Sequence, residues 1–315
     1  MDAYATALAN QPASHAPRPI AGPGTFAALA TRYYGSPKYL ALSTSSRGNY
    51  RRVIDGFLEE HGHRRVDQMR REHVDSVIGK MANRPGAAIV LLKRIRTLLK
   101  YAVAIGWIDR DPSAGVQSYR STEIHIWTED EIASFERRWP VGSRKPLAFA
   151  LLLYTGQRGS DVRRMTWSDI VGQSIRVTQT KTRAKLVIPL HPSLLSILAV
   201  ERVEHVAILT TAYGQPFSVK GFGQMVSAAI TAAGLPARCK AHGLRKAAAR
   251  RLAEAGATAN EIAAVTGHKT LAEVERYTRA ADQEHLAQEA IRKQSVNNEW
   301  QTSPDRVANQ TDKAS

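Results

Sequence analysis

The sequence contains a single cysteine, Cys239, among its 315 residues. One cysteine excludes a disulfide within the chain and a zinc site built from several cysteines, and it suits a reducing compartment such as the cytoplasm. Long hydrophobic runs are also missing. The most apolar stretch, Leu147 to Tyr154, is far shorter than the roughly 20 residues that a membrane-spanning helix needs. The N-terminus also lacks the apolar segment of a signal peptide. We therefore expect a soluble, cytoplasmic protein without a membrane partner.

Acidic residues are scarce relative to basic ones. The chain has 44 lysines and arginines against 28 aspartates and glutamates, a net charge of +16 and a pI near 10.2. Residues 24–118 hold 16 basic and 8 acidic residues, and residues 127–285 hold 22 and 14, so each region carries +8. This charge predicts a polyanionic partner: nucleic acid first, with an anionic membrane surface or simple solubility as weaker alternatives. Two basic regions favour a protein that grips DNA from two sides.

Shifts in composition and periodicity divide the chain into five parts. Residues 1–22, rich in alanine and proline, are expected to be a disordered tail. Residues 23–118 predict an all-α domain, residues 119–126 a linker, and residues 127–285 an α+β domain. Residues 286–315 are expected to be a polar C-terminal tail. The predicted fold is therefore mainly α with a small β-sheet.

The first domain is expected to contain four or five helices. A loop is expected over residues 36–48, and helices are expected near residues 25–33, 50–57, 70–81 and 88–107. The last of these helices carries four cations, for which a solvated face and phosphate contact remain equally open. They are Lys93, Arg94, Arg96 and Lys100.

The second domain begins with a helix that Thr128 and Glu131 start with a capping box. A second, apolar helix is expected over residues 146–154, buried and followed directly by TGQRGSDV. The period then changes to two, because SIRVTQT and KLVIPL alternate apolar and polar residues. Between them KTRA predicts a hairpin turn with Lys181 near its tip. Further helices are expected over residues 192–203 and 217–233.

The stretch from Lys240 to Thr278 predicts three short helices that bring polar side chains to their ends. His242 and Arg245 are three residues apart on the first helix. Thr258 and Glu261 cap the second helix, Gly267 ends it, and His268 follows at once. Thr270 and Glu273 predict a third helix that carries Tyr277.

Each of these residues has an ordinary structural interpretation when it is considered alone. Arg158 would be a surface arginine that Asp161 holds in place, Lys181 a solvated charge, and His268 a cap for its helix. Together, however, two guanidiniums can clamp one phosphate and stabilise the charge of its transition state. A tyrosine hydroxyl can attack phosphorus, and a lysine can protonate the leaving oxygen.

Over residues 24–285 the sequence resembles the tyrosine recombinases of the phage integrase family. The motifs that carry the resemblance are TGQRGSDV, TQTKT, HGLR, TGH and VERYT. It implies a helical, SAM-like core-binding domain and a catalytic domain that form a C-shaped clamp on DNA. It also implies cleavage and rejoining of DNA at specific attachment sites, through a 3′-phosphotyrosyl link and without metal or cofactor. The implied assembly is a homotetramer on synapsed DNA, without a small-molecule substrate.

The resemblance assigns a role to each matching residue. Tyr277 is the expected nucleophile, and Lys181 is the expected general acid, with Lys185 as a weaker substitute. The phosphate is expected to be held by Arg158, His242 and Arg245 and braced by His268, with Asp161 in support. Residues 1–22 are too short for the arm-binding domain that many phage integrases carry, which makes arm-site binding doubtful.

Two other classes of function remain open. One is a DNA-binding protein whose site is inactive, against which the complete set of motifs argues. The other is a nicking-closing enzyme of the type IB topoisomerase kind, which shares the chemistry but needs neither a specific site nor a tetramer. The small helical first domain favours the recombinase.

Overall fold

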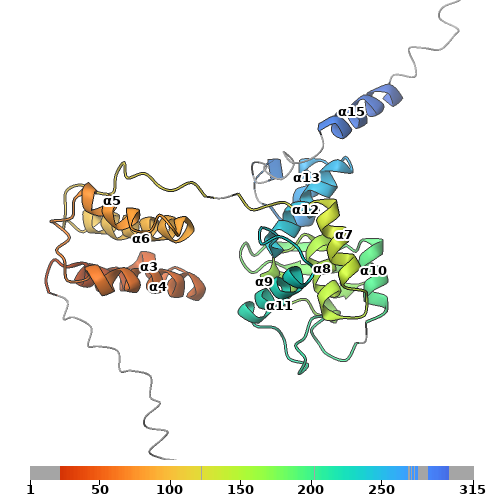
Figure 1. The fold of residues 1–315 in the computed structure, drawn as a ribbon, viewed down its shortest axis with the longest axis horizontal. Coiled ribbons are helices and arrows are strands. Elements are labelled where there is room, and N and C mark those ends of the chain that lie inside the picture. The colour runs from red at the N-terminus through yellow and green to blue at the C-terminus, as the bar shows by residue number, and fades with distance from the viewer. Residues whose placement is uncertain are drawn as a thin grey trace, which may run out of the picture. The chain divides into compact units, whose positions relative to one another are not determined.

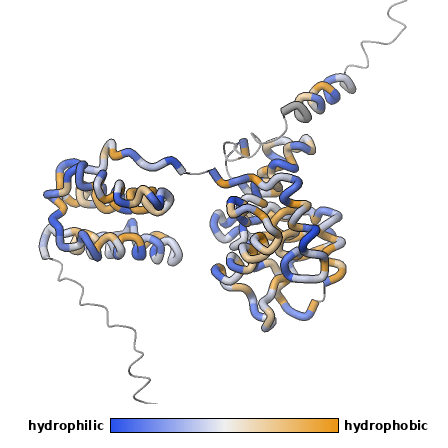
Figure 2. Tube along the Cα trace, viewed as in Figure 1, coloured by the Kyte–Doolittle hydropathy of each residue, from blue (hydrophilic) through white to orange (hydrophobic). Residues whose placement is uncertain are grey.

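The computed structural model describes residues 22–121, 123–201, 203–268, 270, 272, 274–275 and 283–297. The chain divides into two compact units, Met1–Glu123 and Ile124–Ser315 (Figure 1). Figure 2 shows hydrophobic and hydrophilic residues mixed along the helices of both units, as expected of amphipathic helices that bury one face. No helix in the described ranges combines the length and the apolar character needed to cross a bilayer.

The described part of the first unit is helical. Its helices are α2 (Phe26–Tyr34), α3 (Pro37–Leu40), α4 (Thr44–His61), α5 (Arg71–Gly79) and α6 (Pro85–Ala104). Helix α6 contacts α2, α4 and α5. Buried side chains on its inner face include Leu92, Ile95 and Leu99, and Phe26 of α2 meets Phe57 of α4 edge to face. This core makes the helical prediction for the region correct.

The loop expected over residues 36–48 is wrong in part. The Ser36 hydroxyl accepts a hydrogen bond from the Tyr39 backbone, and Pro37 follows at the first helical position, so this segment forms the short helix α3. The Ser43 hydroxyl accepts from the Ser46 backbone and begins α4 earlier than periodicity suggested. Capping therefore extended helical structure into a polar segment that has no apolar repeat.

The four cations of α6 fall into two pairs. The guanidinium of Arg94 lies 3.5 Å from the centre of the Tyr50 ring. Arg96 Nη2 donates to the Val116 carbonyl at 2.6 Å. Lys93 and Lys100 are exposed. Two of the cations thus stabilise the unit internally, and two remain at the surface.

The second unit is built around one apolar helix and a small sheet. Helix α8 (Arg144–Thr155) is almost entirely buried, and α10 (Pro192–Ala199), α11 (Val219–Ala232) and α12 (Ala241–Glu254) pack against it. Helix α7 (Glu129–Arg138) opens the unit with the expected box between Thr128 and Glu131. The remaining elements are α9 (Gly159–Val162), the 3-10 helix η1 (Trp167–Asp169) and α13 (Ala259–Thr266).

The sheet has three antiparallel strands in the order β1-β2-β3. They are β1 (Ile170–Val171), β2 (Ser174–Thr178) and β3 (Lys185–Pro189). The hairpin expected from the period-two pattern is β2–β3, with Ile175 opposite Ile188 and Val177 opposite Leu186. The prediction missed β1, which is two residues long and too short to show a period.

The C-terminal part agrees with the expected helices as far as the structure describes it. The Thr258–Glu261 capping box begins α13, and Gly267 ends it with a left-handed backbone (φ 72°). Helix α15 (Gln283–Asn297) crosses the expected boundary at residue 285 and includes residues 286–297 of the expected polar tail. Tyr277 lies outside the described residues, as do Glu273 of the expected third helix and residues 1–21.

Candidate active site

Arg158 follows the sharp turn that ends α8. Gly156 closes that helix with a left-handed backbone (φ 62°), and a Cβ atom there would lie 3.3 Å from Thr266 Cγ2, so glycine suits both the turn and the close packing. Arg158 is then the N-cap of α9 and is partly buried. Its Nη1 donates to Gln179 Oε1 at 3.1 Å. The guanidinium is therefore held against the β2–β3 loop.

Asp161 has a different partner from the one expected. Its Oδ1 accepts from the backbone N–H of Thr180 at 2.8 Å, in the loop that carries Lys181. Arg158 donates instead to Gln179. The two residues do not share a helix face, because Arg158 has an extended backbone (φ −71°, ψ 149°) and only Asp161 is helical. Asp161 thus anchors the lysine loop.

Arg245 is the most deeply buried cation of the site, with 1% of its surface exposed. It lies one turn into α12, and its Nη1 donates to the carbonyls of Gly156 and Thr266, each at 2.7 Å. His242 lies three residues earlier, in the first turn, and is exposed. The His-x-x-Arg spacing thus gives one fixed guanidinium and one accessible imidazole.

His268 contacts Arg245 directly. Its Nε2 lies 2.8 Å from Arg245 Nη2, and its Nδ1 lies 2.6 Å from the Thr266 hydroxyl. Because arginine can only donate, Nε2 must accept. Burial, followed by the positive charges of Arg245 and Arg158, lowers the pKa of His268 to about 3. At neutral pH the ring is therefore uncharged and accepts a hydrogen bond from the guanidinium of Arg245.

Gln179 connects the lysine loop to both arginines. It is fully buried directly after β2. Its Nε2 donates to Gln157 Oε1 at 2.7 Å and to the Thr266 carbonyl at 2.8 Å, while its Oε1 accepts from Arg158. Lys181 is exposed two residues further on. The loop is thereby tied to the segment that holds Arg245.

The electrostatics of the site favour an anion. Although His242 is exposed as a residue, the protein around its ring removes part of its hydration. This desolvation, and then the charges of Arg245 and Arg158, lower the pKa of His242, and Lys181 contributes in the same direction. The positive charge of Lys181 therefore contributes to the lowered pKa of His242, although the two residues belong to different elements. Arg158, Lys181 and Arg245 together present a concentrated positive potential. A phosphate group is the natural ligand for such a set of donors.

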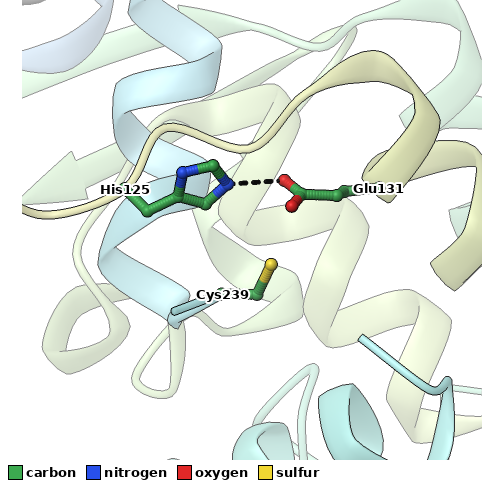
Figure 3. Close-up of side chains that lie close together, drawn as sticks. All are labelled: His125, Glu131 and Cys239. Carbon is green, nitrogen blue, oxygen red and sulfur yellow. Dashed lines mark hydrogen bonds and ion pairs between the residues drawn. The ribbon is translucent and has the colours of Figure 1, made fainter. Parts of the chain in front are cut away.

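A second cluster of polar side chains lies at the base of α12. His125, Glu131 and Cys239 come from three segments and have potential ligand atoms within 4.8 Å of one another (Figure 3). His125 Nε2 lies 2.7 Å from Glu131 Oε2, and Arg238 donates to Glu131 Oε1 at 3.0 Å. Burial opposes ionisation of Glu131, but hydrogen bonds from Thr128, His125 and Arg238 lower its pKa to about 2.

The chemistry of this cluster suits a hydrogen-bonded clamp better than a metal site. Burial, and then the nearby Glu131 carboxylate, raise the pKa of the Cys239 thiol to about 11. A metal would have to displace both the thiol proton and the Arg238 guanidinium. Next to the cluster, Trp127 Nε1 donates to the Lys240 carbonyl at 3.0 Å. These bonds fix the start of the helix that carries His242 and Arg245.

Three residues of the site were missed in the sequence: Gln157, Gln179 and Thr266. All three are fully buried. Two of them interrupt an apolar pattern. Gln179 continues the inward positions of Ile175 and Val177, and Thr266 lies one turn after the buried Ile262. A polar residue at a position that the periodicity assigns to the core is the signal that could have identified them.

Comparison with known proteins identifies the family of the second unit. Residues 129–284 match the model described as the phage integrase family. This part of the chain belongs to the phage integrase family. The integrase of Escherichia phage HK022 is 33% identical over 104 residues, and that of Enterobacteria phage 434 is 26% identical over 180 residues. These matches cover 31% and 56% of this chain, and 29% and 49% of the two relatives.

Solved integrase structures share the fold. A lambda integrase dimer bound to a COC′ core site superposes with a TM-score of 0.73 at 21% identity, covering 81% of this chain and 95% of that one. A lambda integrase tetramer bound to a Holliday junction superposes with a TM-score of 0.70 at 21% identity, covering 85% of each chain. At this identity the likeness concerns the fold, which is mainly helical with a small antiparallel sheet.

Proposed function

We propose that the protein is a site-specific DNA recombinase. It cleaves and rejoins DNA through a 3′-phosphotyrosyl intermediate on Tyr277, and so integrates or excises a mobile element. The observation that carries the proposal is the connection of Arg158, Arg245 and the Lys181 loop through one buried network. A fixed pair of guanidiniums beside an exposed lysine is suited to phosphoryl transfer and has no evident purpose in a purely structural core.

In the proposed reaction the Tyr277 oxygen attacks the scissile phosphorus. The tyrosine proton passes to His242, whose pKa is lowered by desolvation and then by the charges of Arg245 and Arg158, which favours the neutral ring that can accept it. Arg158 and Arg245, together with the protonated His242, bind the non-bridging oxygens and stabilise the charge that develops there. The bond from phosphorus to the 5′ oxygen breaks as Lys181 supplies a proton. Attack by the 5′-hydroxyl of a partner duplex reverses these steps and restores the phosphodiester bond.

The two units would have separate tasks on the DNA. We assign residues 23–118 to the core-binding domain, residues 127–285 to the catalytic domain and residues 119–126 to the linker. The net charge of +8 in each region supports binding to the phosphate backbone. The exposed Lys93 and Lys100 are candidates for phosphate contact. The substrate is a specific attachment site in cytoplasmic DNA.

We further propose that four copies act together on two duplexes. The fold shared with the lambda integrase tetramer on a Holliday junction supports this assembly. The residues after Asp282 would then dock on a neighbouring copy. Sedimentation of the protein with and without synapsed DNA tests the proposal, because a tetramer is expected only on the DNA.

The decisive experiment is a search for the covalent adduct. The full chain is incubated with a nicked duplex that carries its attachment site, taken from the DNA that flanks the gene. Wild type is expected to form an adduct that resists denaturation, and Tyr277→Phe, which keeps the ring and loses the nucleophile, is expected to form none. An absence of adduct from both proteins would refute the catalytic function. Adduct formation on any duplex, without recombinants, would indicate a topoisomerase instead.

A second experiment separates the role of Lys181 from that of Arg245. In a duplex whose scissile 5′ oxygen is replaced by sulfur, the leaving thiolate needs little protonation, because a thiol has a pKa of about 8.5. Lys181→Ala is expected to cleave normal DNA slowly and the sulfur substrate at nearly the wild-type rate. Arg245→Ala, the control, is expected to be slow on both substrates. Equal rescue of the two variants would contradict the general-acid role.

A further inference from the structure

The hydroxyl of Thr266 occupies a defined place behind the two catalytic candidates Arg245 and His268. Thr266 is fully buried at the end of α13. Its Oγ1 donates to the Ile262 carbonyl at 2.6 Å and also lies 2.6 Å from His268 Nδ1. Its carbonyl accepts from Arg245 Nη1 at 2.7 Å. The backbone carbonyl of Thr266 therefore binds Arg245, and its side-chain hydroxyl binds His268, which itself contacts Arg245.

The protons of this cluster can be assigned from the donors available. The Thr266 hydroxyl has one proton, and the Ile262 carbonyl can only accept it. The contact between Thr266 Oγ1 and His268 Nδ1 therefore requires the proton on Nδ1. His268 Nε2 must then be the acceptor, as its contact with the Arg245 guanidinium independently demands. Both ends of the ring specify the same tautomer.

We propose that Thr266 is a positioning residue for DNA cleavage, which holds His268 in the neutral Nδ1–H tautomer so that its Nε2 can fix the Arg245 guanidinium. This inference rests on the proposed function for its catalytic consequence, although the tautomer itself can be observed independently. In this arrangement a chain of hydrogen bonds runs from His268 Nδ1–H to the Thr266 hydroxyl and from that hydroxyl to the Ile262 carbonyl. The order of Arg245 depends on a hydroxyl that does not touch the DNA.

Removing the hydroxyl leaves two unfavourable alternatives. If His268 keeps its proton on Nδ1, that N–H is buried without its acceptor. If the proton moves to Nε2, the Nε2–H of His268 and the N–H of Arg245 face each other as two donors without an acceptor between them. Either outcome loosens Arg245 while its two carbonyl partners remain in place. The expected effect is thus on the rate of cleavage at saturating DNA, with little effect on DNA affinity.

The variants are chosen to change the hydroxyl alone. Thr266→Val is nearly isosteric and lacks the hydroxyl, whereas Thr266→Ser restores it. Thr231→Val is the matched control, because the Thr231 hydroxyl makes the same type of helical bond, to the Ser227 carbonyl, at an exposed position of α11. We expect single-turnover cleavage to slow about tenfold in Thr266→Val and to stay within about twofold of wild type in the other two variants.

The rate comparison has clear contrary results. Wild-type rates in Thr266→Val, or equally slow cleavage by Thr266→Val and Thr266→Ser, would overturn the inference. A matching loss of DNA affinity in Thr266→Val would do the same, because it would indicate a general structural defect. The thermal midpoint of each variant is measured beside its rate, so that unfolding is recognised.

The tautomer is measured on the wild-type protein by ¹⁵N NMR of labelled histidines, with the His268 signal assigned by its loss in His268→Gln. The expected spectrum has a protonated Nδ1 and an unprotonated Nε2 at neutral pH. The opposite tautomer, or a doubly protonated ring, would refute the inference even if no variant folds. If wild type formed no DNA adduct but showed the Nδ1–H tautomer, the proposed function would fail while the assigned proton arrangement stood.

Discussion

Substitution of Gly267 by alanine is the sharpest test of the buried network. Gly267 has a left-handed backbone (φ 72°), and a Cβ atom there would lie 2.4 Å from Gln179 Nε2 and 2.8 Å from its Cδ. That distance is far inside van der Waals contact, so Gln179 must move. Its movement breaks the bonds to Gln157 and to the Thr266 carbonyl, and it also displaces the acceptor of Arg158.

The magnitude follows from two contributions. A left-handed backbone costs a residue with a Cβ about 1–2 kcal/mol. Each of the two lost Gln179 donor bonds adds about 1 kcal/mol. The sum is a destabilisation of about 3–4 kcal/mol. Gly234→Ala is the matched control, since Gly234 has nearly the same backbone (φ 70°) with no atom within 4 Å of the added Cβ. It should lose only the strain, about 1–2 kcal/mol.

The assay compares the two variants with wild type in urea and thermal unfolding. The effect of alanine on the unfolded chain is the same in both and cancels in the comparison. A difference of about 2 kcal/mol corresponds to a midpoint about 4–8 °C lower for Gly267→Ala in a unit of this size. Cleavage by Gly267→Ala is expected to fall about a hundredfold, with Gly234→Ala nearly normal. Equal stability and activity of the two variants would refute the proposed role of Gln179.

Three further predictions concern single groups. Asp161→Ala removes the acceptor of the Thr180 N–H, which should displace Lys181, so cleavage of normal DNA should slow about tenfold and recover on the sulfur-containing substrate. Asp161→Asn keeps an oxygen at this position and should slow cleavage less. Equal slowing by the two variants would contradict the role of Asp161 as the anchor of the Lys181 loop. His268 has a pKa of about 3 when folded and about 6.5 when unfolded. The unfolded chain therefore binds the proton first, and stability present above pH 6.5 is lost at about 1.4 kcal/mol per pH unit as the pH falls toward 3. Between pH 7 and 5 wild type should lose about 2 kcal/mol more than His268→Gln, and parallel pH profiles would refute this. Cys239, whose pKa is raised to about 11 and whose surface is 1% exposed, should react with a thiol reagent only after unfolding, and rapid reaction of the native protein would contradict the clamp.

Short-range signals predicted most of the elements. The capping boxes at Thr128 and Thr258 use side chains three residues apart, and they begin helices where expected. The hairpin followed from the alternation of Ile175 and Val177 with polar neighbours. The short elements α3 and β1 were missed because neither is long enough for its period to repeat.

The hydrogen-bond partners of the candidate site residues were not predicted from the sequence. Asp161 was assigned to Arg158 because they are three residues apart, yet Asp161 binds the Thr180 backbone. The contact of His268 Nε2 with Arg245 was not expected either. These partners come from segments that only folding brings together, whereas the expectations used separation along the chain or analogy.

By itself the sequence determined which chemistry is available: a basic chain with two arginines, a lysine, histidines and a tyrosine in motifs that specify local turns and caps. These features depend on neighbours within a few residues, so they can be read directly. Only the tertiary structure decided that Gln179 and Thr266, 87 residues apart, share one hydrogen bond. The physical reason is that a buried polar group must find a partner wherever the fold supplies one, and this requirement is imposed by packing of the whole unit.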